Sequence, residues 1–274
     1  MAKRKNNNNS VWKVITLIVI VLFIIGITRL TISANDVKTD IGNLEMVMVP
    51  ENIACKTINY EGFSVYFNPE WHIPVCCVHE LTATETLGDK PREKYFSQDE
   101  TVYGCATLDD YKYSGYDRGH MVPAGDMKWS TKAMHDCFYL TNMVPQNGAL
   151  NSGAWNKLEQ KLRDWAQRDE SLMIITGVIV SEEDKKITIG ESNVVVPCML
   201  YKAVLAHKVT PMRAIGFLYP NKKAQGSLAQ HVVSIDEIER LSHLDLFSSL
   251  PDDVEDAIEA TADFKQWNSI KKKK

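Results

Sequence analysis

Short apolar runs of strand length dominate the chain after residue 60, and this feature constrains the fold most. Residues 62–67 alternate apolar with small or polar side chains, and Asn68-Pro69 supplies a turn before a second run at 71–78. The pattern predicts a hairpin that opens the domain. Further strands are predicted at 137–140, 172–176, 187–189, 194–196, 199–205 and 214–219.

Helical periodicity is confined to three segments. The clearest is 152–168, where large apolar residues recur at intervals of three and four; the others are about 234–241, which begins at Ser234, and about 252–268. The polar stretch 83–112 is predicted to be a long loop. The chain has no internal repeat and no Gly/Ser linker, so one mixed α+β domain explains the pattern better than two domains.

The N-terminus carries a targeting or anchoring signal. Residues 14–28 contain no charge, and basic residues precede this run at Lys3, Arg4, Lys5 and Lys13. Such a stretch is either a secretory signal peptide or a membrane anchor, and it sends the following chain across the membrane. We therefore expect export to the periplasm or the extracellular space, with the protein either released or held by a single N-terminal transmembrane helix.

This signal leads to a division of the chain into four parts. We expect a signal peptide or anchor at 1–34, a linker at 35–55, a catalytic domain at 56–270 and a basic tail at 271–274. If the N-terminal segment is not cleaved, the membrane becomes a partner of the protein.

Export has a consequence for the cysteines. An even number in an oxidising compartment predicts at least one disulfide, although buried free thiols are the alternative for any single residue. Cys76 and Cys77 are neighbours in a predicted strand, so their side chains should point to opposite faces. The six cysteines are Cys55, Cys76, Cys77, Cys105, Cys137 and Cys198.

The charge distribution argues against bulk attraction to nucleic acid. The chain has 31 basic and 35 acidic residues, but residues 1–34 and the tail 271–274 carry basic residues and no acid. The part between them is therefore strongly acidic. Any nucleic-acid site must rely on a local basic patch, which Arg118, Lys157, Lys161 and Arg163 could form, and its binding should be weak and sensitive to salt.

The densest group of chemically capable residues lies between 116 and 163. Its order reads as strand, turn, strand, loop and helix, with Asn151 in a position typical of a helix N-cap. Steps of four residues place Asn151, Glu159 and Arg163 on one side of that helix. If the hairpin packs on the same side, His120 meets them across a cleft.

This combination suits phosphoryl chemistry. A histidine can accept a proton from water, and an unperturbed imidazole titrates near pH ~6.5, so cleavage should fall as the pH drops through that range. An amide oxygen is a hard ligand suited to Mg²⁺, and guanidinium groups stabilise charge on phosphate. Taken singly, His120 could be a hairpin-end imidazole, Asn151 a cap, and Glu159 with Arg163 a surface ion pair. The ordered set favours the catalytic interpretation.

The same residues carry a family resemblance. The run Asp117-Arg-Gly-His120, followed by Pro145-Gln146, Leu150-Asn151 and Leu158-Glu159, resembles the DNA/RNA non-specific endonuclease family of ββα-metal nucleases. The resemblance covers roughly residues 60–260. It implies an α+β fold with a mixed, largely antiparallel sheet and a ββα-metal motif.

The resemblance also implies roles for individual residues. His120 would be the general base, and Asn151 would be the sole direct protein ligand of a single Mg²⁺ ion, with Mn²⁺ as a substitute. Glu159 would orient a metal-bound water. Arg118 and Arg163 would bind the scissile phosphate and stabilise the transition state.

Two further residues would support this group. Asp117 and Asn142 would fix the histidine hairpin and the water network. The family usually has one more arginine upstream, for which Arg92 is the only candidate in the chain, but the surrounding loop departs from the pattern and we do not assign it.

Together these observations predict an exported, Mg²⁺-dependent endonuclease that hydrolyses phosphodiester bonds of DNA and RNA. Two other functions stay open: hydrolysis of another phosphodiester, and a catalytically silent surface binding module on the nuclease fold. DNA and RNA are the expected partners, and a second copy of the chain is a further candidate partner.

Overall fold

A computed structural model describes residue 44 and residues 46–269 of the chain. The predicted signal or anchor at 1–34 and the basic tail at 271–274 lie outside the described residues. Within the described part, no helix is long and apolar enough to cross a membrane.

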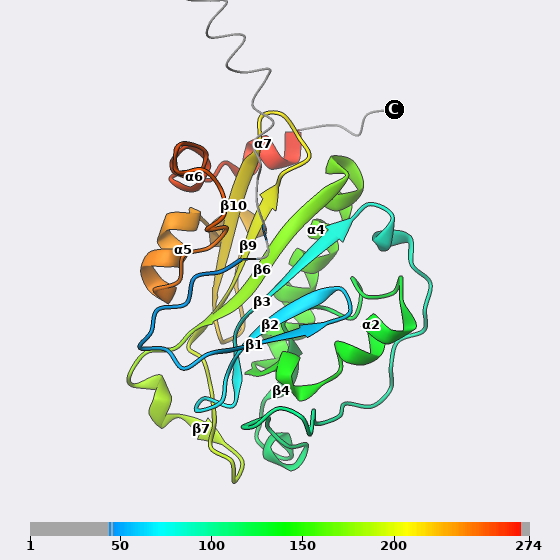
Figure 1. The fold of residues 1–274 in the computed structure, drawn as a ribbon, viewed down its shortest axis with the longest axis vertical. Helices are drawn as coiled ribbons and strands as arrows, with labels where there is room; N and C mark the ends of the chain where they lie inside the picture. The colour runs from blue at the N-terminus through cyan, green and yellow to red at the C-terminus, as the bar shows by residue number, and fades with distance from the viewer. Residues whose placement is uncertain (1–43, 45, 270–274) are drawn as a thin grey trace, which may run out of the picture. The chain divides into compact units, whose positions relative to one another are not determined.

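The centre of the fold is a seven-stranded sheet in the order β1-β2-β3-β6-β9-β10-β11 (Figure 1). Every neighbouring pair in it is antiparallel. The predicted α+β fold with a largely antiparallel sheet is therefore confirmed. The strands are β1 (Lys56–Tyr60), β2 (Phe63–Asn68), β3 (Ile73–Thr82), β6 (Ser171–Ile179), β9 (Met199–Ala206), β10 (Arg213–Pro220) and β11 (Val232–Val233).

Two short hairpins lie outside this sheet. One pairs β4 (Asp117–His120) with β5 (Met143–Gln146), and the other pairs β7 (Thr188–Ile189) with β8 (Val194–Val195). The predicted loop at 83–112 contains only two single-turn helices, η1 (Glu85–Leu87) and η2 (Asp109–Tyr111). Two more single turns are η5 (Asp184–Lys186) and η6 (Leu228–His231).

The central sheet has a helix on each face. On β10, Phe217 packs beside Trp165 of α4 (Asn156–Asp169), with ring centroids 6.2 Å apart. A Cβ atom at the preceding Gly216 would instead meet Ile238 of α5 (Ile235–Ser242) at 2.7 Å. Because successive strand residues point to opposite faces, α4 and α5 cover opposite sides of the sheet (Figure 1).

The predicted helices are partly confirmed. α5 begins as expected after Ser234, whose hydroxyl accepts a hydrogen bond from the backbone N–H of Glu237 at 3.1 Å. The predicted helix at 252–268 is two helices, α6 (Asp252–Glu259) and α7 (Phe264–Ser269). The carboxylate of Asp263 accepts hydrogen bonds from the first turn of α7 and so starts a new helix there.

The predicted strand at 137–140 is wrong. Helix α2 (Thr131–Asp136), capped by Ser130, ends at Cys137, and a single helical turn, η3 (Leu140–Asn142), follows. Phe138 and Leu140 are buried because this turn packs on the core. The missed strand β1 has a polar sequence and lies at the sheet edge, so its periodicity is weak.

The predicted disulfide is also absent, since all six cysteines are free thiols. Cys76 and Cys77 do point to opposite faces: Cys76 lies near Tyr201, which in turn lies near Ser242 of α5, whereas Cys77 lies near Lys202 on the other face. Both are fully buried. The sulfur atoms are packed as small apolar groups in separate parts of the fold.

Candidate active site

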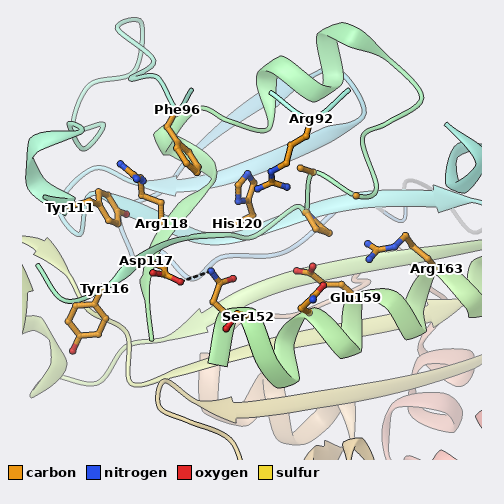
Figure 2. A pocket seen from close by; sticks show the side chains of 15 residues that line it. Arg92, Phe96, Tyr111, Tyr116, Asp117, Arg118, His120, Ser152, Glu159 and Arg163 are labelled. Carbon is orange, nitrogen blue, oxygen red and sulfur yellow. Dashed lines mark hydrogen bonds between the residues drawn. The ribbon is translucent and has the colours of Figure 1, made fainter. Parts of the chain in front are cut away.

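A cleft of about 470 Å³ lies between the β4–β5 hairpin and the helix that follows it (Figure 2). Two of the residues on its walls, Arg92 and Phe96, come from the long loop before β4. The predicted site residues that line it are Asp117, Arg118, His120, Asn151, Glu159 and Arg163. Of the predicted site residues only Asn142 does not line the cleft.

The hairpin places His120 through close packing of its two strands. Gly119 faces Val144 in the register, and His120 faces Met143. A Cβ atom at Gly119 would lie 2.5 Å from the Cβ atom of Gln146. Only glycine lets the strands approach this closely, which explains its place between Arg118 and His120.

The helical arm of the site starts earlier than predicted. Asn147, not Asn151, caps it: the Asn147 side chain accepts hydrogen bonds from the backbone N–H groups of Ala149 and Leu150. A short turn, α3 (Gly148–Leu150), then leads into a π-helical turn, η4 (Asn151–Trp155), before α4. The predicted capping role of Asn151 is therefore wrong, and its side chain is available to the cleft.

The π-helical turn changes which residues share a face. Trp155, four residues after Asn151, is buried and packs edge-on against Tyr219. Glu159 and Arg163, in contrast, line the cleft together with Asn151. The wider turn places Asn151 on the cleft side although Trp155 points into the core.

His120 lies in an aromatic environment. Its ring packs edge-on against Phe138, with centroids 4.8 Å apart, and is 5.4 Å from the ring of Phe96. Its Nε2 atom has no hydrogen-bond partner among the described residues. Burial lowers the pKa of His120 to about 3, and the positive charge of Arg92 adds to this effect.

In this environment the pKa of His120 lies well below the value that the sequence led us to expect. A loss of activity near pH ~6.5 assumed an unperturbed imidazole. In the structure the lowered pKa keeps the ring neutral throughout the physiological range. A neutral imidazole is the form that can accept a proton.

Glu159 is partly buried and forms no hydrogen bond or ion pair within the described residues. Desolvation raises its pKa to about 7, and the nearby carboxylate of Asp126 raises it further, against the opposing charges of Lys202 and Arg163. An additional positive charge in the cleft would therefore favour the ionised form of Glu159.

Asn151 and Asp117 are joined across the cleft. The side-chain NH₂ of Asn151 donates to Oδ2 of Asp117 at 2.9 Å (Figure 2). Since the NH₂ group is engaged, the orientation of the amide is set and its oxygen is free to bind a cation. Asp117 thus holds the amide of Asn151, and its role in fixing the histidine hairpin and the water network stays a prediction.

The arginines differ in their freedom to bind phosphate. Cζ of Arg118 lies 4.6 Å from the ring centroid of Phe96, and Cζ of Arg92 lies 4.9 Å from that of Phe138. Within the described residues neither arginine forms an ion pair. Figure 2 shows Arg92 beside His120, so the residue that the sequence left unassigned lies in the cleft.

Arg163 is held in a buried network. It donates to Oδ1 of Asp126 at 2.6 Å, and the other oxygen of Asp126 lies 3.1 Å from Nε2 of His79. Arg163 lines the cleft, but its ion pair with Asp126 leaves fewer of its N–H groups free to bind phosphate. The structure therefore leaves Arg92 and Arg118 as the arginines with the most freedom.

Asn142 supports the histidine hairpin from below. Its amide exchanges two hydrogen bonds with the backbone of Val122, at 2.9 and 3.0 Å, and donates a third to the carbonyl of Cys137. The residue is fully buried. Its hydrogen bonds hold the chain just after His120, and it does not line the cleft.

Sequence reasoning missed Lys202. It is 1% exposed, donates to Thr176 at 2.8 Å and to the carbonyl of Met121 at 3.2 Å, and lies over the ring of Trp155. Its positive charge acts on Glu159. A single lysine within the apolar strand 199–205 was the available signal, because a lysine is rarely buried without a partner.

The donor set of the cleft fits a hard divalent cation. It offers the amide oxygen of Asn151 and the carboxylate of Glu159, and no cysteine lines it. Mg²⁺ prefers oxygen ligands and commonly keeps several waters, so one or two protein ligands are sufficient. The unpartnered carboxylate of Glu159 is the observation that calls for such a cation.

Known proteins are similar in sequence to this chain. The model of the DNA/RNA non-specific endonuclease family matches residues 41–253. The chain belongs to this family. The resemblance carried by the motif from Asp117 to His120 is thereby confirmed.

Several nucleases named as mitochondrial are similar to this family member. Nuclease EXOG of Xenopus laevis is 35% identical over 71% of this chain and 59% of its own length, and human endonuclease G is 32% identical over 67% of each chain. The chain thus spans about three-fifths of the EXOG relatives it matches. A crystal structure of an EndoG/EndoGI complex shares the fold, with a TM-score of 0.66 and 24% identity over 71% of this chain and 86% of that chain.

The comparisons overturn the predicted location. Relatives that match most of this family member are named as mitochondrial nucleases, which conflicts with an exported or membrane-anchored protein. The prediction used only the N-terminal apolar run, and basic residues next to such a run do not define one destination.

Proposed function

We propose that this chain is a metal-dependent endonuclease that hydrolyses phosphodiester bonds in DNA and RNA with little sequence preference. The observation that carries the proposal is the neutral imidazole of His120, which lines one cleft with Arg118, Asn151 and Glu159. A proton acceptor, an anion-binding group and two oxygen donors in one cleft are the components that phosphodiester hydrolysis needs.

In this proposal His120 accepts a proton from the attacking water. As the water oxygen bonds to phosphorus, its proton moves to the imidazole of His120; the bond to the leaving oxygen breaks, and that oxygen takes a proton from solvent water. The aromatic packing of His120 keeps the ring neutral and holds its orientation. Arg118 and Arg92 bind the phosphate oxygens and stabilise their developing charge, with a smaller contribution from Arg163.

Asn151 and Glu159 would hold the cation. The amide oxygen of Asn151, oriented by Asp117, would bind it directly, and Glu159 would orient a water of its hydration shell. When bound, Mg²⁺ would stabilise negative charge on the phosphate, and Mn²⁺ would substitute for it. The positive charge of Lys202 lowers the pKa of Glu159 and so favours its ionised form.

The test is incubation of the purified protein with supercoiled plasmid and with RNA, with Mg²⁺ or with a chelator. We expect cleavage of both polymers with Mg²⁺ only, and none by His120→Ala. Hydrolysis of a small phosphodiester without cleavage of either polymer would favour a different substrate. Tight binding without any hydrolysis would favour a silent binding module.

We also propose that the catalytic domain spans 56–270, preceded by a linker at 35–55 and a separate segment at 1–34, and followed by the tail at 271–274. Strand β1 begins at Lys56, but Met48 already exchanges two backbone hydrogen bonds with Asp245, so part of the segment 35–55 packs on the domain. Limited proteolysis followed by mass measurement tests it: a stable fragment starting within 35–55 is expected, and cuts spread through 56–270 would contradict it. Binding of a second copy of the chain stays a prediction.

A further inference from the structure

A second group of acidic side chains lies away from the cleft, at the C-terminal helices. Asp236 and Glu239 belong to α5, Asp245 follows it, and Glu255 and Glu259 belong to α6. One carboxylate oxygen from each of Asp236, Glu239 and Glu259 lies within 4.8 Å of the others. The same holds for Glu239, Asp245 and Glu255, so Glu239 belongs to both triads. We call these five residues the carboxylate cluster.

Proximity alone is common among acidic residues, but Glu259 adds an independent observation. Its side chain is 2% exposed, and its Oε1 atom has no hydrogen-bond partner. Oδ1 of Asp245 is likewise buried and without a partner. Burying an unpaired carboxylate is costly, so a native structure normally supplies a ligand to such an oxygen.

The described residues do not supply a positively charged partner for these carboxylate oxygens. No lysine, arginine or histidine forms an ion pair with any member of the carboxylate cluster in the part of the chain that the structure covers. Glu239 accepts a hydrogen bond from the backbone N–H of Leu246, at 2.7 Å, which leaves most of the cluster's oxygen atoms open to a cation. Burial and then the neighbouring carboxylates raise the pKa of Glu259 to about 9.

We infer that the carboxylate cluster is a binding site for one Ca²⁺ ion. The donors are all oxygen atoms, which excludes the soft metals that prefer sulfur or imidazole. Carboxylates that can each offer one or two oxygen atoms, in two triads that share Glu239, suit the six to eight oxygen ligands of Ca²⁺ better than the small octahedral shell of Mg²⁺, which retains its waters. Glu239 would bridge the two triads, and Glu259 would supply the buried ligand.

The position of the cluster assigns it a role separate from the proposed catalysis. α5 packs on the face of the sheet opposite α4, which carries Glu159. Bound Ca²⁺ would connect α5, the segment after it and α6, and would stabilise the protein by binding the native state. Cleavage on the other face would not depend on it.

The test measures Ca²⁺ binding to the full chain by calorimetry in the presence of saturating Mg²⁺, with thermal unfolding alongside. We expect one bound Ca²⁺ and a rise in Tm. In Glu239→Gln and Glu259→Gln the affinity should fall by about 10-fold or more, as expected for loss of a metal ligand. Glu237→Gln is the matched control, because Glu237 is paired with Arg240 on the same helix at 2.7 Å; it should bind Ca²⁺ like the wild type.

Two results would overturn the inference. One is the absence of stoichiometric Ca²⁺ binding by the wild type, which would mean that shared protons neutralise the cluster. The other is equal Ca²⁺ affinity in wild type, Glu239→Gln and Glu259→Gln, which would place the ion elsewhere. Asn151→Ala should retain Ca²⁺ binding, and loss of binding in this variant would assign the ion to the cleft.

Discussion

At the scale of single residues, the side chains that line the cleft differ in protonation state and in their partners. His120 is neutral and unpartnered, whereas Glu159 titrates near neutral pH and Arg163 is held by Asp126. The pH response of the protein should therefore follow the carboxyl group and not the imidazole.

We predict that cleavage at limiting Mg²⁺ falls as the pH drops below about 7. Burial raises the pKa of Glu159 to about 7, so the carboxyl group is protonated below that value and no longer attracts a cation. Raising Mg²⁺ favours the ionised form and should move the midpoint to lower pH. Rate profiles at two Mg²⁺ concentrations measure this shift.

The residual activity of Glu159→Gln provides the control for the pH prediction. This variant should show no inflection near pH 7, because the lowered pKa of His120 keeps the ring neutral down to about pH 3. Another group titrates if the inflection persists in Glu159→Gln. The same conclusion follows if the midpoint of the wild-type pH profile is the same at both Mg²⁺ concentrations.

We predict that His120→Ala and Asn151→Ala fail in different ways. His120→Ala should bind Mg²⁺ and DNA but lose about 10²–10⁴-fold in cleavage, the usual cost of removing a general base. Asn151→Ala should bind Mg²⁺ more weakly, so that high Mg²⁺ restores part of its activity. Mg²⁺ titrations of both variants on one plasmid distinguish these outcomes, and identical responses to the metal would contradict the assignment.

At the scale of secondary structure, the site depends on two local features. The β4–β5 hairpin brings its strands together at Gly119, and the π-helical turn at Asn151–Trp155 connects the Asn147 cap to α4. Both features position side chains that line the cleft.

We predict that Gly119→Ala damages the site through the hairpin. The new Cβ would lie 2.5 Å from Cβ of Gln146, an atom that can move only with its backbone. Overpacking of this kind costs about 1–3 kcal/mol, and a shift of His120 by an ångström can cost about 10²-fold in rate. Plasmid cleavage and urea unfolding measure the two effects.

Gly153→Ala is the matched control for Gly119→Ala. A Cβ atom at Gly153 has nothing within 4 Å, and the residue lies in the helical arm. Its stability should stay equal or rise by a few tenths of a kcal/mol, because alanine restricts the unfolded chain. Equal activity in Gly119→Ala and Gly153→Ala would show that the hairpin tolerates the extra atom.

At the scale of the whole molecule, a buried ion network ties α4 to the rest of the fold. The carboxylate of Asp169, at the end of α4, accepts hydrogen bonds from Arg168 and from Arg213 of β10. Arg168 also donates to the backbone carbonyl of Trp267 in α7, and the guanidinium of Arg213 lies over the ring of Trp267. Asp169 and the two arginines that it binds thus connect α4, β10 and α7, which are distant in sequence.

We predict that Asp169→Asn is strongly destabilising. It would leave two buried guanidinium groups without their counter-charge, and breaking a buried pair in this way costs roughly 3–5 kcal/mol. Asp164→Asn, on the exposed side of α4, should change the free energy of unfolding by less than about 0.5 kcal/mol. Urea unfolding compares the two, and a similar small effect in both would show that the network adds little.

The sequence by itself determined the features that depend on neighbouring residues. Strand alternation predicted β2, β3, β6, β9 and β10, and Ser234 located the start of α5. The order of the motif between Asp117 and Glu159 indicated that His120 faces the helical arm across a cleft. These features follow from local backbone preferences and side-chain periodicity, which a linear sequence contains.

Only the tertiary structure decided the features that depend on packing between distant segments. It brought Arg92 from a loop to His120, placed Lys202 where its charge acts on Glu159, and left all six cysteines as free thiols. It moved the helix cap to Asn147 and gathered the carboxylate cluster. Desolvation and long-range contacts set these properties, since the dielectric surroundings of a side chain are defined only once the chain has folded around it.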